Sequence, residues 1–135
     1  MRVVIDTNIL VSALIAPAGK PAVIIRAWLD GKFTFLTCEE HVDELRATLS
    51  KPNLAALIKP HKAGRLINQI KELADDVGNL PFVERSADPK DDFLLAMCEA
   101  GQADYLVTGD KSGLLALEKH AAARIISARD FAALF

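Results

Sequence analysis

The chain has 135 residues, of which 51% are hydrophobic and 25% charged, and its formal net charge is -2. This composition excludes a disordered chain, and the length fits one domain over residues 1–135. The charge argues against a protein that binds nucleic acid mainly through a large basic surface, but not against a nuclease whose carboxylates offset its lysines. No apolar run approaches the ~20 residues of a membrane span, and no signal peptide precedes the first strand, so we expect a cytoplasmic protein.

The first half of the chain reads as two strands with helices after each. Arg2–Ile5 is rich in β-branched residues, as a buried parallel strand requires. Proline and glycine punctuate the helical segments that follow. Two helices are predicted at Ile9–Leu14 and Pro21–Leu29, a second strand at Phe33–Cys38, a helix at Glu39–Leu49 and a short helix at Leu54–Ile58.

The second half continues the alternation. An amphipathic helix is predicted over Lys62–Asp76, followed by a weak strand at Phe82–Glu84, a helix that begins at Pro89, and strands at Ala103–Thr108 and Arg124–Ser127. Strands that alternate with helices over short connections form parallel sheets with helices on both faces. We therefore predict an α/β protein: a three-layer α/β/α sandwich with a central parallel sheet of about five strands.

Cysteine and histidine point to no metal centre. Cys38 and Cys98 each lie among apolar neighbours and are expected to be buried free thiols rather than a disulfide. The sequence has no CxxC motif and no Cys/His cluster, which argues against structural zinc. His41, His61 and His120 are scattered over polar segments, and we expect all three at the surface.

Two aspartates follow predicted strands directly. Asp6 comes after Val3-Val4-Ile5, and Asp110 follows Tyr105-Leu106-Val107 by three residues. If the strands are parallel, both carboxylates lie at one edge of the sheet, where sites of such folds form. The alternative for Asp6 is to cap the helix that begins near Ile9, although Asn8 could cap it equally well.

A third acid is predicted at Asp92. Asp88 before Pro89 is a good helix cap, which explains Asp88 and the first-turn Asp91 but not Asp92. The following residues are apolar nearly all round the helix, which indicates burial. Only Asp92 and Glu99, two turns apart, form a polar line, so Asp92 is expected to face the site.

The fourth candidate is Glu44. Glu44 and Asp43 lie on opposite sides of a helix whose buried stripe contains Leu45, and periodicity does not choose between them. Carboxylates that converge repel one another unless a cation lies between them. Mg²⁺ and Mn²⁺ prefer oxygen ligands and can activate water at a phosphodiester.

These segments resemble the PIN domain family. The Asp6-Thr7-Asn8 opening, Glu44 in Asp-Glu-Leu-Arg, Asp92-Phe-Leu-Leu-Ala and Val-Thr108-Gly-Asp110 match its four acidic motifs in order and cover essentially the whole chain. The resemblance implies a Mg²⁺- or Mn²⁺-dependent ribonuclease with Asp6, Glu44, Asp92 and Asp110 as metal ligands and catalytic acids. It favours Glu44 over Asp43, and the run of aspartates leaves Asp91 as the alternative to Asp92.

The same resemblance implies supporting residues and partners. Asn8 and Thr108 are expected to orient the acids or metal waters, with Thr7 and Ser12 as further supporting hydroxyls. A small PIN protein is commonly the toxin of a type II toxin–antitoxin pair, so an RNA substrate, a cognate antitoxin protein and a homodimer are expected. The alternative is a catalytically inactive PIN-like module that binds RNA or protein.

Overall fold

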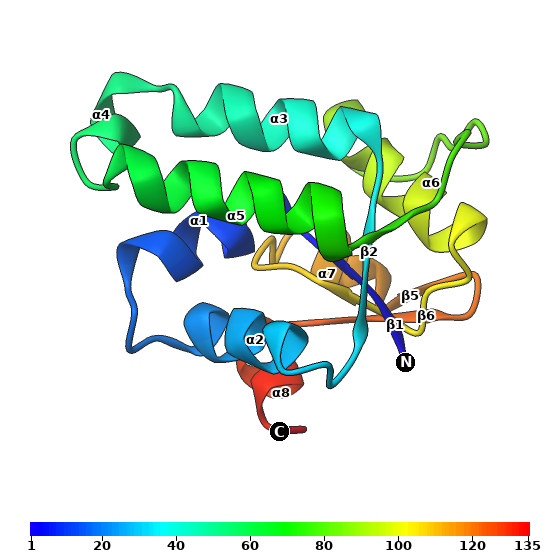
Figure 1. Ribbon diagram of the computed structural model, residues 1–135. Coiled ribbons are helices and arrows are strands. Elements are labelled where there is room, and N and C mark those ends of the chain that lie inside the picture. The colour runs from blue at the N-terminus through cyan, green and yellow to red at the C-terminus, as the bar shows by residue number, and fades with distance from the viewer.

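The chain is built around one six-stranded sheet. The computed structural model describes all 135 residues and orders the strands β3-β2-β1-β4-β6-β5 (Figure 1). All neighbouring strands are parallel except β5, which runs antiparallel to β6. The strands are β1 (Arg2–Ile5), β2 (Thr34–Thr37), β3 (Asp75–Asp76), β4 (Tyr105–Val107), β5 (Lys119–His120) and β6 (Ala123–Ile126).

Helices cover both faces of this sheet, as predicted. Prolines occupy the first or second position of α2, α4 and α5, in the first turn, where the missing N–H costs no hydrogen bond. The helices are α1 (Thr7–Ile15), α2 (Lys20–Leu29), α3 (Glu39–Leu49), α4 (Pro52–Ala55), α5 (Pro60–Leu73), the 3₁₀ turn η1 (Pro89–Asp91), α6 (Asp92–Ala100), α7 (Leu114–Leu117) and α8 (Ala128–Ala132).

The alternation of side chains along β1 produces the three layers. Val3 and Ile5 belong to an 18-residue core with α1, α2, α3, α5 and α8. Val4 points to the other face and packs in a separate 12-residue core with α6 and α7. Successive strand residues face opposite sides of a sheet, so β1 is apolar throughout because both of its faces are covered.

The edges of the sheet differ from the predictions. Phe82–Glu84 is not a strand, because β3 at Asp75–Asp76 already pairs with β2 on that side. The predicted helix over Lys62–Asp76 ends at Leu73 for the same reason. The short helix predicted at Leu54–Ile58 lies earlier, at Pro52–Ala55.

The burial of side chains confirms the prediction for the two cysteines, but the prediction that all three histidines lie at the surface is wrong for two of them. Cys38 and Cys98 are free and buried, and His61 is exposed. However, His41 is 2% exposed and His120 is 9% exposed. Both lie at contacts between elements that are distant in sequence, which a local polar pattern does not reveal.

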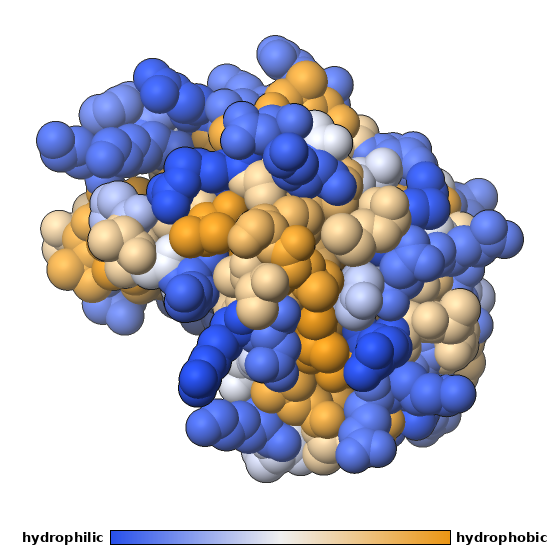
Figure 2. All heavy atoms as spheres, turned by 90° about the horizontal axis from the view of Figure 1, so that it is seen from below, coloured by the Kyte–Doolittle hydropathy of each residue, from blue (hydrophilic) through white to orange (hydrophobic).

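No single helix is long and apolar enough to cross a membrane, and α1 and α2 meet the length and composition criteria only as a pair bent by 100°. Figure 2 shows a band of apolar side chains, flanked by polar ones, on the face seen from below Figure 1. This face carries α2, α8 and the C-terminus (Figure 1).

Candidate active site

The strand order reverses between β1 and β4. From β1 the chain adds β2 and β3 on one side, then returns to place β4 on the other side of β1. Open α/β sheets bind ligands at the carboxyl ends of the strands at such a switch point. Asp6 follows β1 and Thr108 follows β4 at this point, and the backbone N–H of Asp6 donates to the carbonyl of Val107 at 2.9 Å.

Asp6 is a buried carboxylate at the end of β1. The residue is 7% exposed, and burial is the main reason why its pKa lies above the ordinary 3.8. The nearby charge of Asp110 raises the pKa further, whereas a hydrogen bond from the Thr108 hydroxyl to Oδ2, 2.8 Å long, opposes the rise. Backbone N–H groups of Thr7 and Asn8 also lower the pKa of Asp6.

Those two N–H groups belong to the start of α1, which bears on the capping alternative. Asp6 occupies the N-cap position by backbone conformation, but its side chain makes no hydrogen bond of capping geometry. The carboxylate is therefore oriented mainly by Thr108, across the β1–β4 junction. This arrangement favours the functional interpretation of Asp6 over the capping one.

Thr108 connects Asp6 with Asp110. Its side chain is fully buried, and its Oγ1 donates to Asp6 and accepts the backbone N–H of Asp110 at 3.2 Å. The Asp110 carboxylate in turn accepts from the backbone N–H groups of Gly113 at 3.1 Å and Leu114 at 3.3 Å. Asp110 therefore also tethers the start of α7.

Gly113 makes room for the Asp110 carboxylate. A Cβ at position 113 would lie 2.0 Å from Asp110 Oδ2, far inside van der Waals contact. The residue is thus required by close approach, which sequence reasoning overlooked although the Gly-Asp-Lys-Ser-Gly spacing contained it.

Glu44 reaches the site through Thr7. The Thr7 hydroxyl donates a short hydrogen bond to Glu44 Oε1, and Thr7 itself is 2% exposed. Asp43, the alternative on the same helix, is exposed and lines a separate surface cavity with Arg46 and Lys71. The structure therefore brings Glu44, and not Asp43, towards Asp6.

Asp91, and not Asp92, is the third acid that joins this group. Burial, together with the charges of the neighbouring carboxylates, raises the pKa of Asp91 to about 6; these carboxylates are Asp6, Asp88, Asp110 and Glu44. Asp91 is the N-cap residue of α6 but makes no capping hydrogen bond with its side chain, so capping does not explain it.

The Asp92 carboxylate faces the backbone of the preceding loop. Its Oδ1 accepts from Ser86 N at 2.8 Å and Arg85 N at 3.2 Å. These bonds, above all that from Ser86, lower the pKa of Asp92. The structure therefore leaves Asp92 outside the acidic group, in contrast to the expectation from sequence, because a contact six residues back in the chain holds it.

The remaining expected supporters differ in their contacts. Thr7 and Thr108 each donate to one of the acids, as expected of supporting hydroxyls. Asn8 and Ser12 are exposed, and the side chains of both make no hydrogen bond within the protein.

Four carboxylates that are negatively charged when ionised are thus related in space. We call them the acidic group: Asp6, Glu44, Asp91 and Asp110. No three His, Cys, Asp or Glu side chains converge closely enough to hold a metal ion as they stand. The donor set is nevertheless all oxygen. Burial is the main reason for the raised pKa values of Asp6 and Asp91, and neighbouring carboxylates add to the rise, a repulsion that a divalent cation would relieve.

A comparison with protein families matches residues 2–112 to the PIN domain. The chain belongs to the PIN domain family. PIN domains are generally nucleases and typically use divalent metal ions. The match includes every member of the acidic group and ends two residues after Asp110. Comparisons with curated proteins and with solved structures found no match.

Proposed function

We propose that this PIN domain is a divalent-metal-dependent endoribonuclease that hydrolyses RNA phosphodiester bonds. The observation that carries the proposal is the acidic group itself: four carboxylates from separate elements lie within electrostatic range of one another near the point where the strand order reverses. Keeping like charges together costs folding free energy, so a purely structural origin is unfavourable. An all-oxygen site suits Mg²⁺ or Mn²⁺ and phosphodiester hydrolysis.

The donor set fits such an ion chemically. Mg²⁺ commonly binds one or two carboxylates and keeps several waters, so it does not require three preassembled ligands. Asp6 and Asp91 would bind the ion directly, with Asp110 and Glu44 as further ligands or water-orienting groups. Once bound, the ion would polarise the phosphodiester and acidify a water molecule.

The protein's own contribution is to orient these oxygens. Thr108 donates to Oδ2 of Asp6 and so restricts the orientation of this carboxylate. Thr7 plays the same part for Glu44. Lys90 and Lys111 are exposed and adjacent in sequence to Asp91 and Asp110, so they are placed to contact phosphates at the rim.

Cleavage of a mixed RNA substrate tests the proposal. We expect wild-type protein to cleave with Mn²⁺ or Mg²⁺ and to stop in EDTA. Asp6→Asn and Asp91→Asn should each lose more than about 100-fold in rate, since even outer-shell changes cost 10–100-fold. Asp43→Asn is the matched control, an exposed carboxylate one residue from Glu44. Undiminished cleavage by both site variants would refute the assignment.

The biological role within this proposal is that of a toxin in a type II toxin–antitoxin pair, acting in the cytoplasm as a homodimer. Growth arrest on expression, dependent on Asp6 and relieved by the product of a short neighbouring gene, would support this role.

Light scattering of the purified protein tests the proposed homodimer, and a monomer at micromolar concentration would contradict it.

One observation favours a second candidate, an inactive PIN-like module that binds RNA or protein. No three acids stand in ion-binding geometry. This candidate predicts RNA binding that persists in EDTA, with no cleavage under any divalent ion. Calorimetric titration with Mn²⁺ separates the two: stoichiometric binding that Asp6→Asn weakens supports the nuclease.

A further inference from the structure

The loop that leads into α6 is closed on itself by hydrogen bonds. Asp92 accepts the backbone N–H groups of Arg85 and Ser86, and the Ser86 hydroxyl donates to the carbonyl of Asp88 at 2.5 Å. Asp88 caps η1 by accepting the N–H of Lys90 at 3.0 Å, and the N–H of Asp91 donates to the Asp88 carbonyl at 2.9 Å. Residues 85–92 therefore form one hydrogen-bonded turn.

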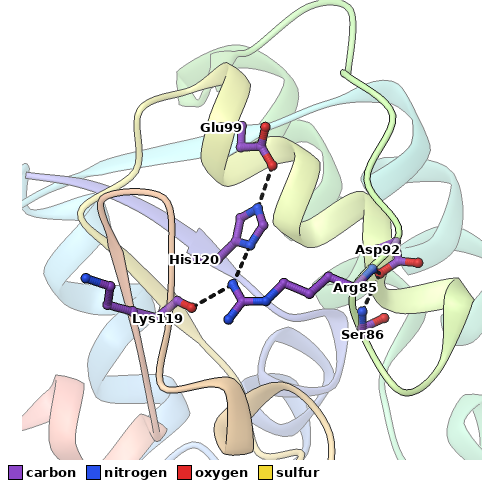
Figure 3. A network of polar contacts seen from close by, with 6 residues as sticks. All are labelled: Arg85, Ser86, Asp92, Glu99, Lys119 and His120. Atoms are coloured by element: carbon purple, nitrogen blue, oxygen red, sulfur yellow. Dashed lines mark hydrogen bonds and ion pairs between the residues drawn. The ribbon is translucent and has the colours of Figure 1, made fainter.

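The side chain of Arg85 fastens this turn to the far edge of the sheet. Its Nη1 donates to the carbonyl of Lys119 at 2.9 Å and lies 2.7 Å from Nδ1 of His120 (Figure 3). Nε2 of His120 contacts Glu99 Oε2 at 2.5 Å. Glu99 belongs to the same helix as Asp92, two turns further along, so the contacts form a brace that begins and ends on α6 (Figure 3).

The chemistry of the donors assigns the proton positions in this brace. A guanidinium only donates, so Nδ1 of His120 accepts from Arg85. Nε2 then carries the proton and donates to the Glu99 carboxylate. The neutral imidazole therefore serves as the link between a cation and an anion, and each of its nitrogens has a partner although the residue is 9% exposed.

Asp91 lies at the point where the turn meets the helix. The carboxylate of its neighbour Asp92 accepts hydrogen bonds from the loop, whereas the charges of Asp6, Glu44 and Asp110 contribute to the raised pKa of Asp91. Adjacent residues at a helix start project in different directions, by roughly 100°. The hydrogen bonds that fix the backbone between Asp88 and Asp92 therefore set the direction in which the Asp91 side chain leaves the main chain.

We infer that Asp92 and Arg85 are positioning residues that, through His120 and Glu99, hold the turn before α6 so that Asp91 faces the rest of the acidic group. The inference rests on the proposed function, because it assigns Asp91 to the nuclease site. It differs from that function in naming residues that touch neither metal nor RNA. Such supporting partners typically matter by 10–100-fold in metal affinity or activity.

Paired substitutions at position 92 give the sharpest test. Asp92→Ala removes the acceptor for two backbone N–H groups, whereas Asp92→Asn keeps an acceptor oxygen and loses only the charge. We expect Asp92→Ala to lower kcat about 10–100-fold with KM for RNA little changed, and Asp92→Asn to recover most of that loss. Asp91→Asn, by contrast, should be inactive.

Two measurements without RNA report on the brace directly. Amide hydrogen exchange of Arg85 and Ser86 should be faster in Asp92→Ala than in wild type. Calorimetric affinity for Mn²⁺ should fall in Asp92→Ala and Arg85→Ala. Arg129→Ala is the matched control, since Arg129 is exposed on α8 and its guanidinium makes no hydrogen bond; it should behave as wild type.

The outcomes separate this inference from the function on which it rests. Asp92→Asn as inactive as Asp91→Asn would overturn it, because the charge of Asp92 would then act directly. Unchanged exchange and unchanged kcat in Asp92→Ala would overturn it as well. If wild-type protein neither cleaves RNA nor binds Mn²⁺, the proposed function fails, while faster exchange in Asp92→Ala still supports the brace.

Discussion

Two adjacent aspartates should affect the stability of the metal-free protein in opposite directions. Burial and neighbouring carboxylates raise the pKa of Asp91 from 3.8 to about 6, whereas hydrogen bonds from Ser86 and Arg85 lower that of Asp92. A folded state that raises the pKa of an acid disfavours its charged form. At pH 7, Asp91→Asn should therefore stabilise the fold and Asp92→Asn should destabilise it.

The size of the Asp91 effect follows from its pKa. Each pH unit between the unfolded and folded values corresponds to about 1.4 kcal/mol, so the change from 3.8 to about 6 gives about 3 kcal/mol as an upper limit. Asp91 is partly exposed, and solvent screening reduces the expected gain to about 1 kcal/mol. Because the folded protein binds the proton more tightly, this gain should disappear as the pH falls from about 6 to 4.

Urea denaturation in EDTA at pH 7 and pH 4.5 measures both effects. Wild type, Asp91→Asn and Asp92→Asn are compared at equal protein concentration, and the midpoint is read at an unchanged slope. Mg²⁺ should then reverse the order of wild type and Asp91→Asn, because a bound cation stabilises only the intact acidic group. Loss of stability in Asp91→Asn at pH 7, or shifts of the same sign in both variants, would refute the placement of Asp91.

Three further predictions concern single residues. Burial lowers the pKa of His41 to about 4, so between pH 6.5 and 4 the unfolded chain binds a proton that the folded protein does not. The free energy of unfolding should therefore fall as the pH drops from 6.5 to 4. His41→Leu should reduce this pH dependence in urea titrations. Gly113→Ala places a Cβ on the Asp110 carboxylate and should lower kcat at least about 10-fold while circular dichroism stays unchanged; normal kcat would contradict the contact. Burial raises the pKa of both Cys38 and Cys98 to about 12, so neither thiol should react with Ellman's reagent at pH 8 until the protein is unfolded.

Local patterns were sufficient for most of the fold. β1 and α3 have the predicted bounds, because an apolar β-branched run and an amphipathic helix with clear ends are recorded in consecutive residues. The sheet edges were not predictable in this way. Asp75–Asp76 becomes a strand only because β2 offers an unpaired edge next to it, and nothing in two aspartates indicates that pairing.

The membership of the acidic group shows the same division. Asp6 and Asp110 follow strands, so parallel pairing alone predicts that they share one end of the sheet. Glu44 could not be distinguished from Asp43 by periodicity, and its selection came from the family resemblance; the contact with Thr7 is a long-range one.

The third acid depended on tertiary structure. Helix-capping preferences identified Asp88 as an N-cap residue, and its carboxylate does accept a hydrogen bond from the backbone N–H of Lys90. The same preferences explained Asp91 as a first-turn acid and left Asp92 for the site. These preferences do not predict that the backbone N–H groups of Arg85 and Ser86 bind the Asp92 carboxylate, which leaves Asp91 to face the other acids.

The sequence by itself thus determined the α/β class, the PIN resemblance and the strand-end acids, because all of these depend on residues close together in the chain. Only the tertiary structure decided between Asp91 and Asp92, and it placed His41 and His120 in the interior. The physical reason is that a carboxylate takes its role from the donors and charges around it, and in a folded chain these come from segments far apart in sequence.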